Sequence, residues 1–278
     1  MGGAQHNVIG NISAGAVTFG DHSPATAHGP AAAPPRGHST VLLIVAADVE
    51  RRAAVAAITT LTGTPPRPGR SRNQTWFTLG RVSATEVVIA QVGQGTETPD
   101  SAIGVMELVD AVRPDAVILL GICYGLRDEG RRPQRLGDVI VASQLILVAH
   151  RKVADTVILR GGAVHPSPVV LDRCRAALTG WDDDIPVHLG PMVSESVLVD
   201  SAGYRERLKE LCPEAVGGEM EGASVYAAAI RNDVKWGVVK AICDWGHGKN
   251  DDHQEVAAAN AAAFTAHLIG TGGLDPVP

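Results

Sequence analysis

The 278-residue sequence lacks any apolar run of the roughly 20 residues that a membrane-spanning helix needs. Its N-terminal residues, MGGAQHNVIG, lack the basic start and the apolar centre of a signal peptide. The four cysteines, Cys123, Cys174, Cys212 and Cys243, are widely spaced and form no CxxC pair. These absences argue against a membrane protein, a zinc framework and a disulfide scaffold, so we expect a cytoplasmic protein with reduced thiols.

Positive charge and aromatic residues are also scarce. The 24 Lys and Arg residues are outnumbered by 30 Asp and Glu, and the formal net charge of −6 argues against binding nucleic acid through its phosphates. Only 4% of the residues are aromatic, although 45% are apolar. A core of Val, Ile, Leu and Ala is typical of α/β proteins, and the length suits one large domain or two small ones.

The two ends of the chain differ from its centre. Residues 1–38 are rich in Gly, Ala and Pro, with full charges only at Asp21 and Arg36, so we expect a disordered or weakly β segment and a linker. Within it, residues 8–19 (VIGNISAGAVTF) allow a second interpretation, a strand that docks on the sheet edge of a protein partner. We place the domain at 39–272 and a tail at 273–278.

From residue 39 onward, short β-branched runs alternate with helical patterns. We expect strands at 41–47, 85–92, 115–120, 137–148, 187–194, 215–220 and 236–243. We expect helices at 49–62, 98–112, 168–179, 200–212, 221–231 and 253–269. Because the strands are apolar almost throughout, they predict a largely parallel sheet that is covered on both faces.

Polar residues or glycines follow five of the predicted strands. In chain order they are Asp48 and Glu50, Gly93 and Gly95, Gly121 and Gly125, Glu219 and Glu221, and Asp244. In open α/β sheets, ligands bind beyond the carboxyl ends of the strands. The coincidence at five strands predicts one shared cleft, in which the glycines let a ligand approach the backbone closely.

Each of these features also has a structural interpretation. Asp48 and Glu50 are typical of a helix start, where they interact favourably with the helix dipole. The two glycine motifs match neither a P-loop nor GxGxxG, and ordinary strand-to-helix turns explain them equally well. Asp244 follows its strand directly beside Trp245, which makes it a candidate acid, with a helix cap or a salt bridge as the alternative.

Six stretches form a specific combination in a fixed order. They are VLLIVAADVERRAAV (41–55), VGQG (92–95), PDAVILLGICYGLRDEGRRPQRLGDVIVA (114–142), GPMVSESVLVD (190–200), GGEMEGASVYAAA (217–229) and VVKAICDWGHGKNDDHQEVAAANAAAF (238–264). Together they resemble the nucleoside phosphorylase and nucleosidase superfamily, in particular methylthioadenosine/S-adenosylhomocysteine nucleosidases and their bacterial relatives. The resemblance implies a three-layer α/β/α sandwich with a mixed, largely parallel central sheet. It also implies an enzyme that cleaves a ribose-to-purine N-glycosidic bond, and we expect adenine as the base.

The resemblance places two catalytic carboxyl groups. Asp244 matches the acid that protonates N7 of the purine, and Glu50 matches the carboxylate that activates the attacking water in the hydrolases. This division of labour is the usual one in glycoside hydrolysis. Because an oxocarbenium-like transition state is cationic, nearby carboxylates stabilise it more than the neutral ground state.

The resemblance also assigns residues that bind the substrate. Glu221 matches the residue that holds the ribose hydroxyl groups, with Met220 beneath the sugar and Glu219 assisting. Leu198 and Val199 fall where the family lines the base pocket. The remaining residues assigned to the pocket are Gly93, Gly121 and Tyr124.

Departures from the family bear on the nucleophile and the base. The phosphorolytic members resemble one another in an Arg and a Ser that bind phosphate around the GxxxG turn, and here Leu119 and Ile122 stand in those positions. This exchange favours water over phosphate, although Arg51 or Arg52 as phosphate contacts leave a phosphorylase as the alternative. Where nucleosidases stack an aromatic residue on the purine, this sequence has Leu198, and Tyr124 either stacks instead or narrows the pocket.

The loop at 246–253 (GHGKNDDH) has two interpretations. It is a polar lid whose Asp251 or Asp252 caps the next helix, or its His247 and Lys249 contact a 5′-phosphate. The expected ligand is therefore a small-molecule purine nucleoside or nucleotide, bound without a metal or a cofactor. From the family we expect a homo-oligomer. A third function is a nucleotide-binding sensor or effector of a bacterial conflict system, recruited through the N-terminal segment.

Overall fold

The computed structural model describes residues 37–95, 99–130, 133–153, 157–181 and 184–276. The predicted docking segment at 8–19 lies outside the described residues. The strands are β1 (Ser39–Val45), β2 (Arg67–Arg70), β3 (Thr75–Val82), β4 (Thr85–Gln91), β5 (Ala116–Gly125), β6 (Val139–Leu147), β7 (Arg151–Val153), β8 (Val157–Leu159), β9 (Ala163–Val164), β10 (Val187–Ser194), β11 (Gly217–Glu219) and β12 (Lys235–Asp244). The helices are α1 (Asp48–Thr62), α2 (Pro99–Val112), α3 (Pro168–Ala177), α4 (Ala202–Leu211), α5 (Gly222–Arg231) and α6 (Gln254–Gly270).

The main sheet has a parallel centre. Its strand order is β11-β10-β6-β12-β5-β1-β4-β3-β2, and β1 runs parallel to both β4 and β5, as β12 does to β5. Antiparallel strands β2 and β3 extend one side. The predicted mixed, largely parallel sheet is therefore confirmed.

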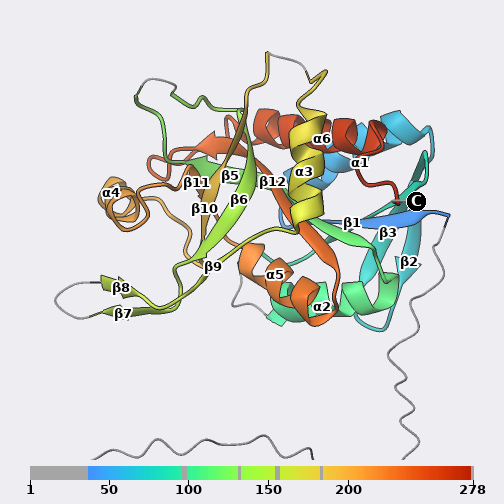
Figure 1. Cartoon of the computed structure of the whole chain (residues 1–278), viewed down its shortest axis with the longest axis horizontal. Coiled ribbons are helices and arrows are strands. Elements are labelled where there is room, and N and C mark those ends of the chain that lie inside the picture. The colour runs from blue at the N-terminus through green and yellow to red at the C-terminus, as the bar shows by residue number, and fades with distance from the viewer. Residues whose placement is uncertain (1–36, 96–98, 131–132, 154–156, 182–183, 277–278) are drawn as a thin grey trace, which may run out of the picture. The chain divides into compact units, whose positions relative to one another are not determined.

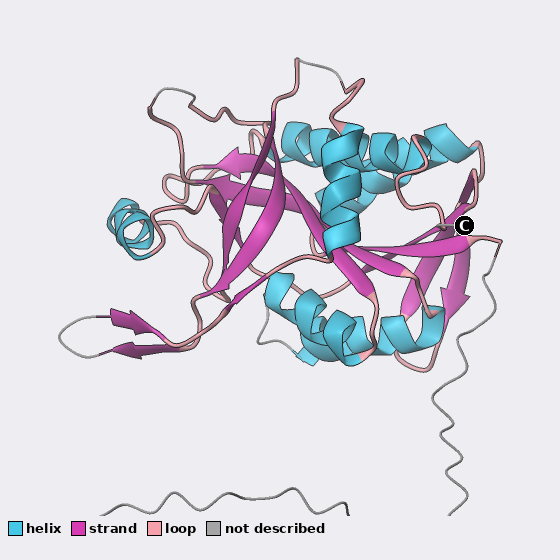
Figure 2. Ribbon diagram, in the orientation of Figure 1, coloured by secondary structure: helices cyan, strands magenta, loops and turns pink. Residues whose placement is uncertain are grey.

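Helices cover the two faces of this centre. In Figures 1 and 2, α1, α3 and α6 lie on one face, and α2 and α5 lie on the other. Successive side chains of β1 pack on opposite faces of the sheet. Leu43 packs in the core cluster that includes residues of α1 and α6. Leu42 and Ile44 pack in the cluster that includes residues of α2 and α5. This arrangement explains why the strand is apolar throughout, and it is the predicted three-layer sandwich.

The sheet also closes on itself at one side. β12 pairs antiparallel with β6, β6 pairs with β10, and β10 pairs with the short strand β11. β11 then pairs with the end of β5, where Gly218 lies opposite Tyr124. This ring brings the Glu219 end of β11 beside the carboxyl ends of β5 and β12, although these segments are far apart in the sequence.

Five strands are absent from the sequence-based expectation. They are β2, β3, β7, β8 and β9. Two of them, β7 and β8, pair only with each other and form a separate two-stranded sheet. Four of these strands have only two to four residues, and the Pro and Gly of β2 and the mostly half-exposed residues of β3 weaken the apolar alternation that signals a strand. Every predicted helix and strand has a counterpart in the structure.

Part of the predicted C-terminal tail is packed on the domain. The Asp275 carboxylate accepts hydrogen bonds from the hydroxyls of Ser83 and Thr85, both at 2.7 Å, and Ser39 Oγ donates to the carbonyl of Leu274. The domain boundaries themselves stay predictions. Within the described ranges, none of the helices combines the length and the apolar character that a membrane crossing requires.

Candidate active site

A cavity of about 340 Å³ opens where β1, β5, β11 and β12 end. The shared cleft that the strand ends predict is therefore present. Nine of the predicted site residues line it, namely Glu50, Tyr124, Leu198, Val199, Glu219, Met220, Glu221, Asp244 and Lys249. Asp244 and Glu221, on which an enzymatic interpretation depends, share this one cavity.

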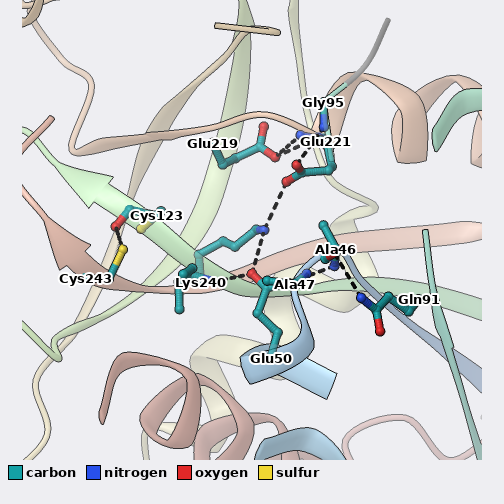
Figure 3. Close-up of polar contacts among 12 residues, drawn as sticks. Ala46, Ala47, Glu50, Gln91, Gly95, Cys123, Glu219, Glu221, Lys240 and Cys243 are labelled. Atoms are coloured by element: carbon teal, nitrogen blue, oxygen red, sulfur yellow. Dashed lines mark hydrogen bonds and ion pairs between the residues drawn. The ribbon is translucent and has the colours of Figure 1, made fainter. Parts of the chain in front are cut away.

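Glu50 lies in the first turn of α1 and is only 3% exposed. Its Oε2 accepts hydrogen bonds from the backbone N–H groups of Ala46 and Ala47 at 2.7 and 2.8 Å, and its Oε1 accepts one from Ile122 at 2.7 Å (Figure 3). Gly121 makes room for this carboxylate, because a Cβ there would lie 1.9 Å from Oε1. Glu50 thus satisfies backbone donors at the helix start and lines the cavity, so its structural and functional interpretations are compatible.

A buried lysine joins two carboxylates of the site. Lys240 extends from β12 with 1% exposure, and its Nζ lies 3.7 Å from Glu50 Oε1 and 3.4 Å from Glu221 Oε2 (Figure 3). The other oxygen of Glu221 accepts a hydrogen bond of 3.0 Å from the backbone N–H of Gly95. Glu221 is therefore held from two sides, by a strand and by a glycine loop.

Glu219 organises the turn that carries Met220 and Glu221. Its Oε2 accepts hydrogen bonds from the backbone N–H groups of Glu221 at 2.8 Å and Gly222 at 2.7 Å, where α5 begins. Glu219 is buried, with 3% exposure. The two glutamates therefore differ in their contacts. Glu219 stabilises the turn through backbone hydrogen bonds, and Glu221 forms an ion pair with Lys240.

The pKa shifts of Glu219 and Lys240 reflect the presence of three buried carboxyl groups around one buried ammonium. Burial, and then the nearby Glu221, raise the pKa of Glu219, and the Lys240 ammonium offsets part of that rise. Burial alone lowers the pKa of Lys240, but the three surrounding carboxylates outweigh it, so that this pKa lies above its usual value. Lys240 is therefore a permanent cation among three acids, and the cluster favours a further positive charge.

Asp244 is the last residue of β12, and it also lines the cavity. Its Oδ1 accepts a hydrogen bond from the backbone N–H of Gly246 at 2.7 Å. Its Oδ2 accepts one from the thiol of Cys243 at 3.1 Å and lies 3.4 Å from the Nζ of Lys249. The predicted salt bridge is thus present, in the same cavity as the predicted acid function.

The wall of the cavity beside Asp244 is apolar. Leu198 is 64% exposed, whereas Val199 and Tyr124 are buried. The Tyr124 hydroxyl lies over Gly218, since a Cβ there would come within 2.0 Å of it. Burial raises the pKa of Tyr124 well above its usual value. This position of the ring favours the second sequence-based interpretation, in which Tyr124 narrows the pocket.

Three predicted site residues do not line the cavity. Gly121 lies behind the Glu50 carboxylate, Gly93 precedes the lining residue Gln94, and His247 is exposed on the following loop. Their roles in binding stay predictions. For Gly121, the structure supplies a different reason for the absence of a side chain, which is the close approach of Glu50.

Lys240 is not among the site residues predicted from the sequence. The signal is present in the run WGVVKAIC (236–243), where one lysine interrupts an otherwise apolar strand. A charge inside a doubly covered strand is costly unless it is paired, so this lysine predicts a buried carboxylate partner. Its partners, Glu50 and Glu221, are not predictable from spacing, because they come from distant elements.

The donor set of the cavity does not suggest a metal centre. Among the residues for which the structure gives a placement, no group of three or more His, Cys, Asp or Glu side chains has the arrangement of a metal site. The buried glutamates instead face backbone N–H groups and the Lys240 ammonium.

Most of the chain is similar to known sequences. A family model described as "Phosphorylase superfamily" matches residues 41–270. The chain is 26% identical over 258 residues to a death domain-containing ATP nucleosidase of Amphimedon queenslandica, a match that covers 82% of this chain but only 48% of the relative. It is 24% identical over 207 residues to a 5′-methylthioadenosine/S-adenosylhomocysteine nucleosidase of Maridesulfovibrio salexigens, covering 69% of this chain and 85% of that protein.

Solved structures share the fold. The 5′-methylthioadenosine/S-adenosylhomocysteine nucleosidase of Neisseria meningitidis, in complex with methylthio-immucillin-A, aligns with a TM-score of 0.70 at 19% identity, over 84% of this chain and 99% of that chain. The futalosine hydrolase of Helicobacter pylori aligns with a TM-score of 0.69 at 18% identity, over 84% and 98% of the two chains. At these identities, the likeness establishes the arrangement of the elements.

Proposed function

Because the chain belongs to the phosphorylase superfamily, we propose that it is a nucleosidase that hydrolyses the N-glycosidic bond of a purine nucleoside or nucleotide, with adenine as the base. One observation carries the proposal: Glu50, Glu221 and Asp244 come from three distant elements and line a single cavity. The names of the relatives support the reaction class, since they include an ATP nucleosidase and a methylthioadenosine/S-adenosylhomocysteine nucleosidase.

In the proposed reaction, Asp244 is the acid at the base. It passes a proton to a ring nitrogen of the purine while the bond from C1′ to the base breaks and its electron pair stays with the base. A water molecule attacks C1′, and Glu50 takes its proton. The three backbone N–H groups around Glu50 fix the direction of its carboxylate, which is what a base that must meet a positioned water requires.

The sugar occupies the cavity between these two groups in the proposed complex. Glu221 accepts hydrogen bonds from the ribose hydroxyls, and Met220 packs beneath the ring. As positive charge develops at C1′, the buried carboxylates of Glu50, Glu219 and Glu221 outnumber the single ammonium of Lys240. The cluster therefore stabilises the transition state more than the neutral substrate.

Water is the proposed nucleophile because a phosphate would find few partners. Leu119 is fully buried, and the backbone N–H of Ile122 is bonded to Glu50. Arg51 and Arg52 both pair with Asp48 and do not line the cavity. Of the cavity-lining residues in the described part of the chain, Lys249 is the one cationic side chain, and it is paired with Asp244. A buried phosphate without donors is costly.

A chromatographic screen of purine nucleosides and nucleotides, with and without inorganic phosphate, tests the function. The panel includes adenosine, methylthioadenosine, AMP and ATP, because the relatives' names span both thio-nucleosides and a nucleotide. We expect free base without added phosphate. Ribose 1-phosphate formed only in the presence of phosphate would establish a phosphorylase instead. Binding without any product over hours would favour a nucleotide-binding module.

The variant Asp244→Asn tests the assigned acid. We expect base release to fall by about 10²–10⁴-fold, the contribution typical of a positioned general acid. Unchanged secondary structure and an unchanged urea midpoint serve as the control for folding. Full activity in this variant would remove Asp244 from the mechanism. The cytoplasmic location, the homo-oligomeric state and a partner for residues 8–19 stay predictions, as does a role in a conflict system.

A further inference from the structure

The Asp244 carboxylate already receives donors on both of its oxygens. Gly246 N–H binds Oδ1, while the thiol of Cys243 and the ammonium of Lys249 both face Oδ2. Donors on both oxygens suit the carboxylate form, which accepts hydrogen bonds and has no proton to transfer. An acid at this position therefore needs a source of a proton inside the cavity.

Two groups beside Oδ2 carry a proton. Burial and then the neighbouring Asp244 raise the pKa of the Cys243 thiol, so this thiol retains its proton as a hydrogen-bond donor. Lys249 lines the cavity, keeps 23% of its side chain exposed and lies 3.4 Å from the carboxylate oxygen. The ammonium is therefore the better source, because solvent can restore a proton that it has lost.

The loop geometry keeps Lys249 beside Asp244. The backbone N–H of Lys249 donates to Asp200 Oδ1 at 3.2 Å, and the backbone N–H of Ser201 donates to the carbonyl of Gly246 at 2.8 Å. These two bonds join the loop after β12 to the segment that carries Leu198 and Val199. The ion pair is thus held between the two loops that form the base end of the cavity.

We propose that Lys249 supplies the proton that Asp244 passes to the departing base, an inference that rests on the proposed function. When the purine fills the cavity and displaces water, the ion pair becomes a neutral pair: an Nζ–H bond breaks and an Oδ2–H bond forms. Asp244 then transfers this proton to the ring nitrogen as the bond to C1′ breaks and its electron pair goes to the base. Lys249 remains as a neutral amine and takes up a proton from solvent after release.

The test compares Lys249→Met, Lys249→Arg and a matched control with the unchanged protein. Methionine removes the charge and the proton, whereas arginine keeps the charge and holds its proton too tightly to release it. The control is Lys209→Met on α4, which removes another lysine-carboxylate pair of similar separation (3.1 Å) and exposure (28%) outside the cavity. Each protein is assayed with adenosine or the best purine substrate of the screen, and with 4-nitrophenyl ribofuranoside, whose leaving group departs without protonation.

We expect both Lys249 variants to lose about 10²-fold or more in kcat on the purine substrate and to stay within about threefold on the nitrophenyl riboside. Lys209→Met should match the unchanged protein on both substrates. If Lys249→Arg restores purine hydrolysis, Lys249 only balances the charge of Asp244, and the proposal is wrong. An equal loss on both substrates would also overturn it, because that result indicates a structural defect.

A second readout does not depend on turnover. Calorimetry of adenine binding in two buffers with different ionisation enthalpies counts the protons that are taken up. In the unchanged protein the proton moves within the Lys249–Asp244 pair, so we expect almost no uptake, whereas Lys249→Met must draw about one proton from solvent to offer a neutral Asp244 to the base. Equal proton uptake in both proteins would contradict the proposed role of Lys249, whether or not a purine substrate is hydrolysed. The absence of hydrolysis would separately refute the proposed function.

Discussion

The two ends of the cavity are built in different ways. At the end proposed to bind the sugar, Glu50, Glu219 and Glu221 are buried, and each accepts a hydrogen bond from at least one backbone N–H. At the end proposed to bind the base, Asp244 is the last residue of β12, and Lys249 lies on the loop that follows, beside a segment in which Leu198 is 64% exposed. The proposed sugar end is thus held at strand ends and helix starts, whereas the proposed base end combines the end of β12 with loops.

This difference separates positioning from adaptability. Carboxylates fixed by backbone donors keep one geometry, which a water-activating base and a charge-stabilising cluster require. Loops with exposed apolar side chains can rearrange around a base at little cost, because few buried contacts are lost. We therefore expect changes at the sugar end to affect stability and activity together, and changes at the base end to affect activity more than stability.

The largest expected effect comes from Lys240→Met. The variant leaves Glu50, Glu219 and Glu221 buried without their cation, and breaking a buried ion pair from one side typically costs about 3–5 kcal/mol. Urea unfolding followed by circular dichroism measures the loss. Lys209→Met, which removes a partly exposed pair, is the control and should cost about 0–1 kcal/mol. Equal midpoints for the two variants would refute a structural role for the buried cation.

The next effect is that of Gly121→Ala. The added Cβ would lie 1.9 Å from Glu50 Oε1, so the carboxylate must move away from its backbone donors. We expect a loss of roughly 1–3 kcal/mol in the free energy of unfolding from overpacking, and a concurrent fall in base release. Gly203→Ala on α4 is the matched control, because a Cβ there meets nothing within 4 Å. A fully active Gly121→Ala would show that the position of Glu50 is not critical.

The smallest expected effect is a change in the pH dependence of stability, caused by Glu195→Gln near the base end of the cavity. Glu195 is 1% exposed at the start of the segment that carries Leu198, and its Oε2 accepts a hydrogen bond of 2.6 Å from the Tyr204 hydroxyl. Burial raises the pKa of Glu195 above its ordinary value of 4.5, and Tyr204 and Arg151 only partly offset the rise. The folded protein therefore binds this proton more tightly than the unfolded chain.

The sign of the effect follows from that difference. A raised carboxyl pKa makes the folded state less stable as pH increases from 4.5 through the folded-state value, because the unfolded chain gives up its proton first. Glutamine cannot titrate, so its stability relative to the unchanged protein should increase between about pH 5 and about pH 8. Urea midpoints at both values measure the change, with the exposed Glu206→Gln as the control. A difference that stays constant with pH would show that Glu195 does not titrate in this range.

The sequence predicts the parallel centre of the fold well because its signals are local. The runs that become β1, β5 and β12 are apolar on both faces, and the helices between them have regular patterns. Short strands such as β2 and β8 carry no such signal, because their residues are largely exposed. Their pairing depends on neighbours that are supplied by the rest of the fold.

The candidate site divides in the same way. Asp244, Glu50 and Glu221 are predictable from their places at strand ends and from the resemblance to a known family. The pairing of Lys240 with two of the carboxylates is not, nor is the fact that Gly121 gives space to Glu50 rather than to a ligand. These contacts join residues more than fifteen positions apart in every case, and no local pattern encodes which of them meet.

The amino-acid sequence alone therefore determined the helices, the strands of the parallel centre and the acidic residues at their ends, since these follow from local apolar patterns and chain order. Only the tertiary structure decided that β11 closes a ring with β5, that the buried Lys240 ammonium pairs with both Glu50 and Glu221, and that Lys249 lies against Asp244. The physical reason is that burial and ion pairing depend on distances between elements, and those distances exist only once the sheet has assembled.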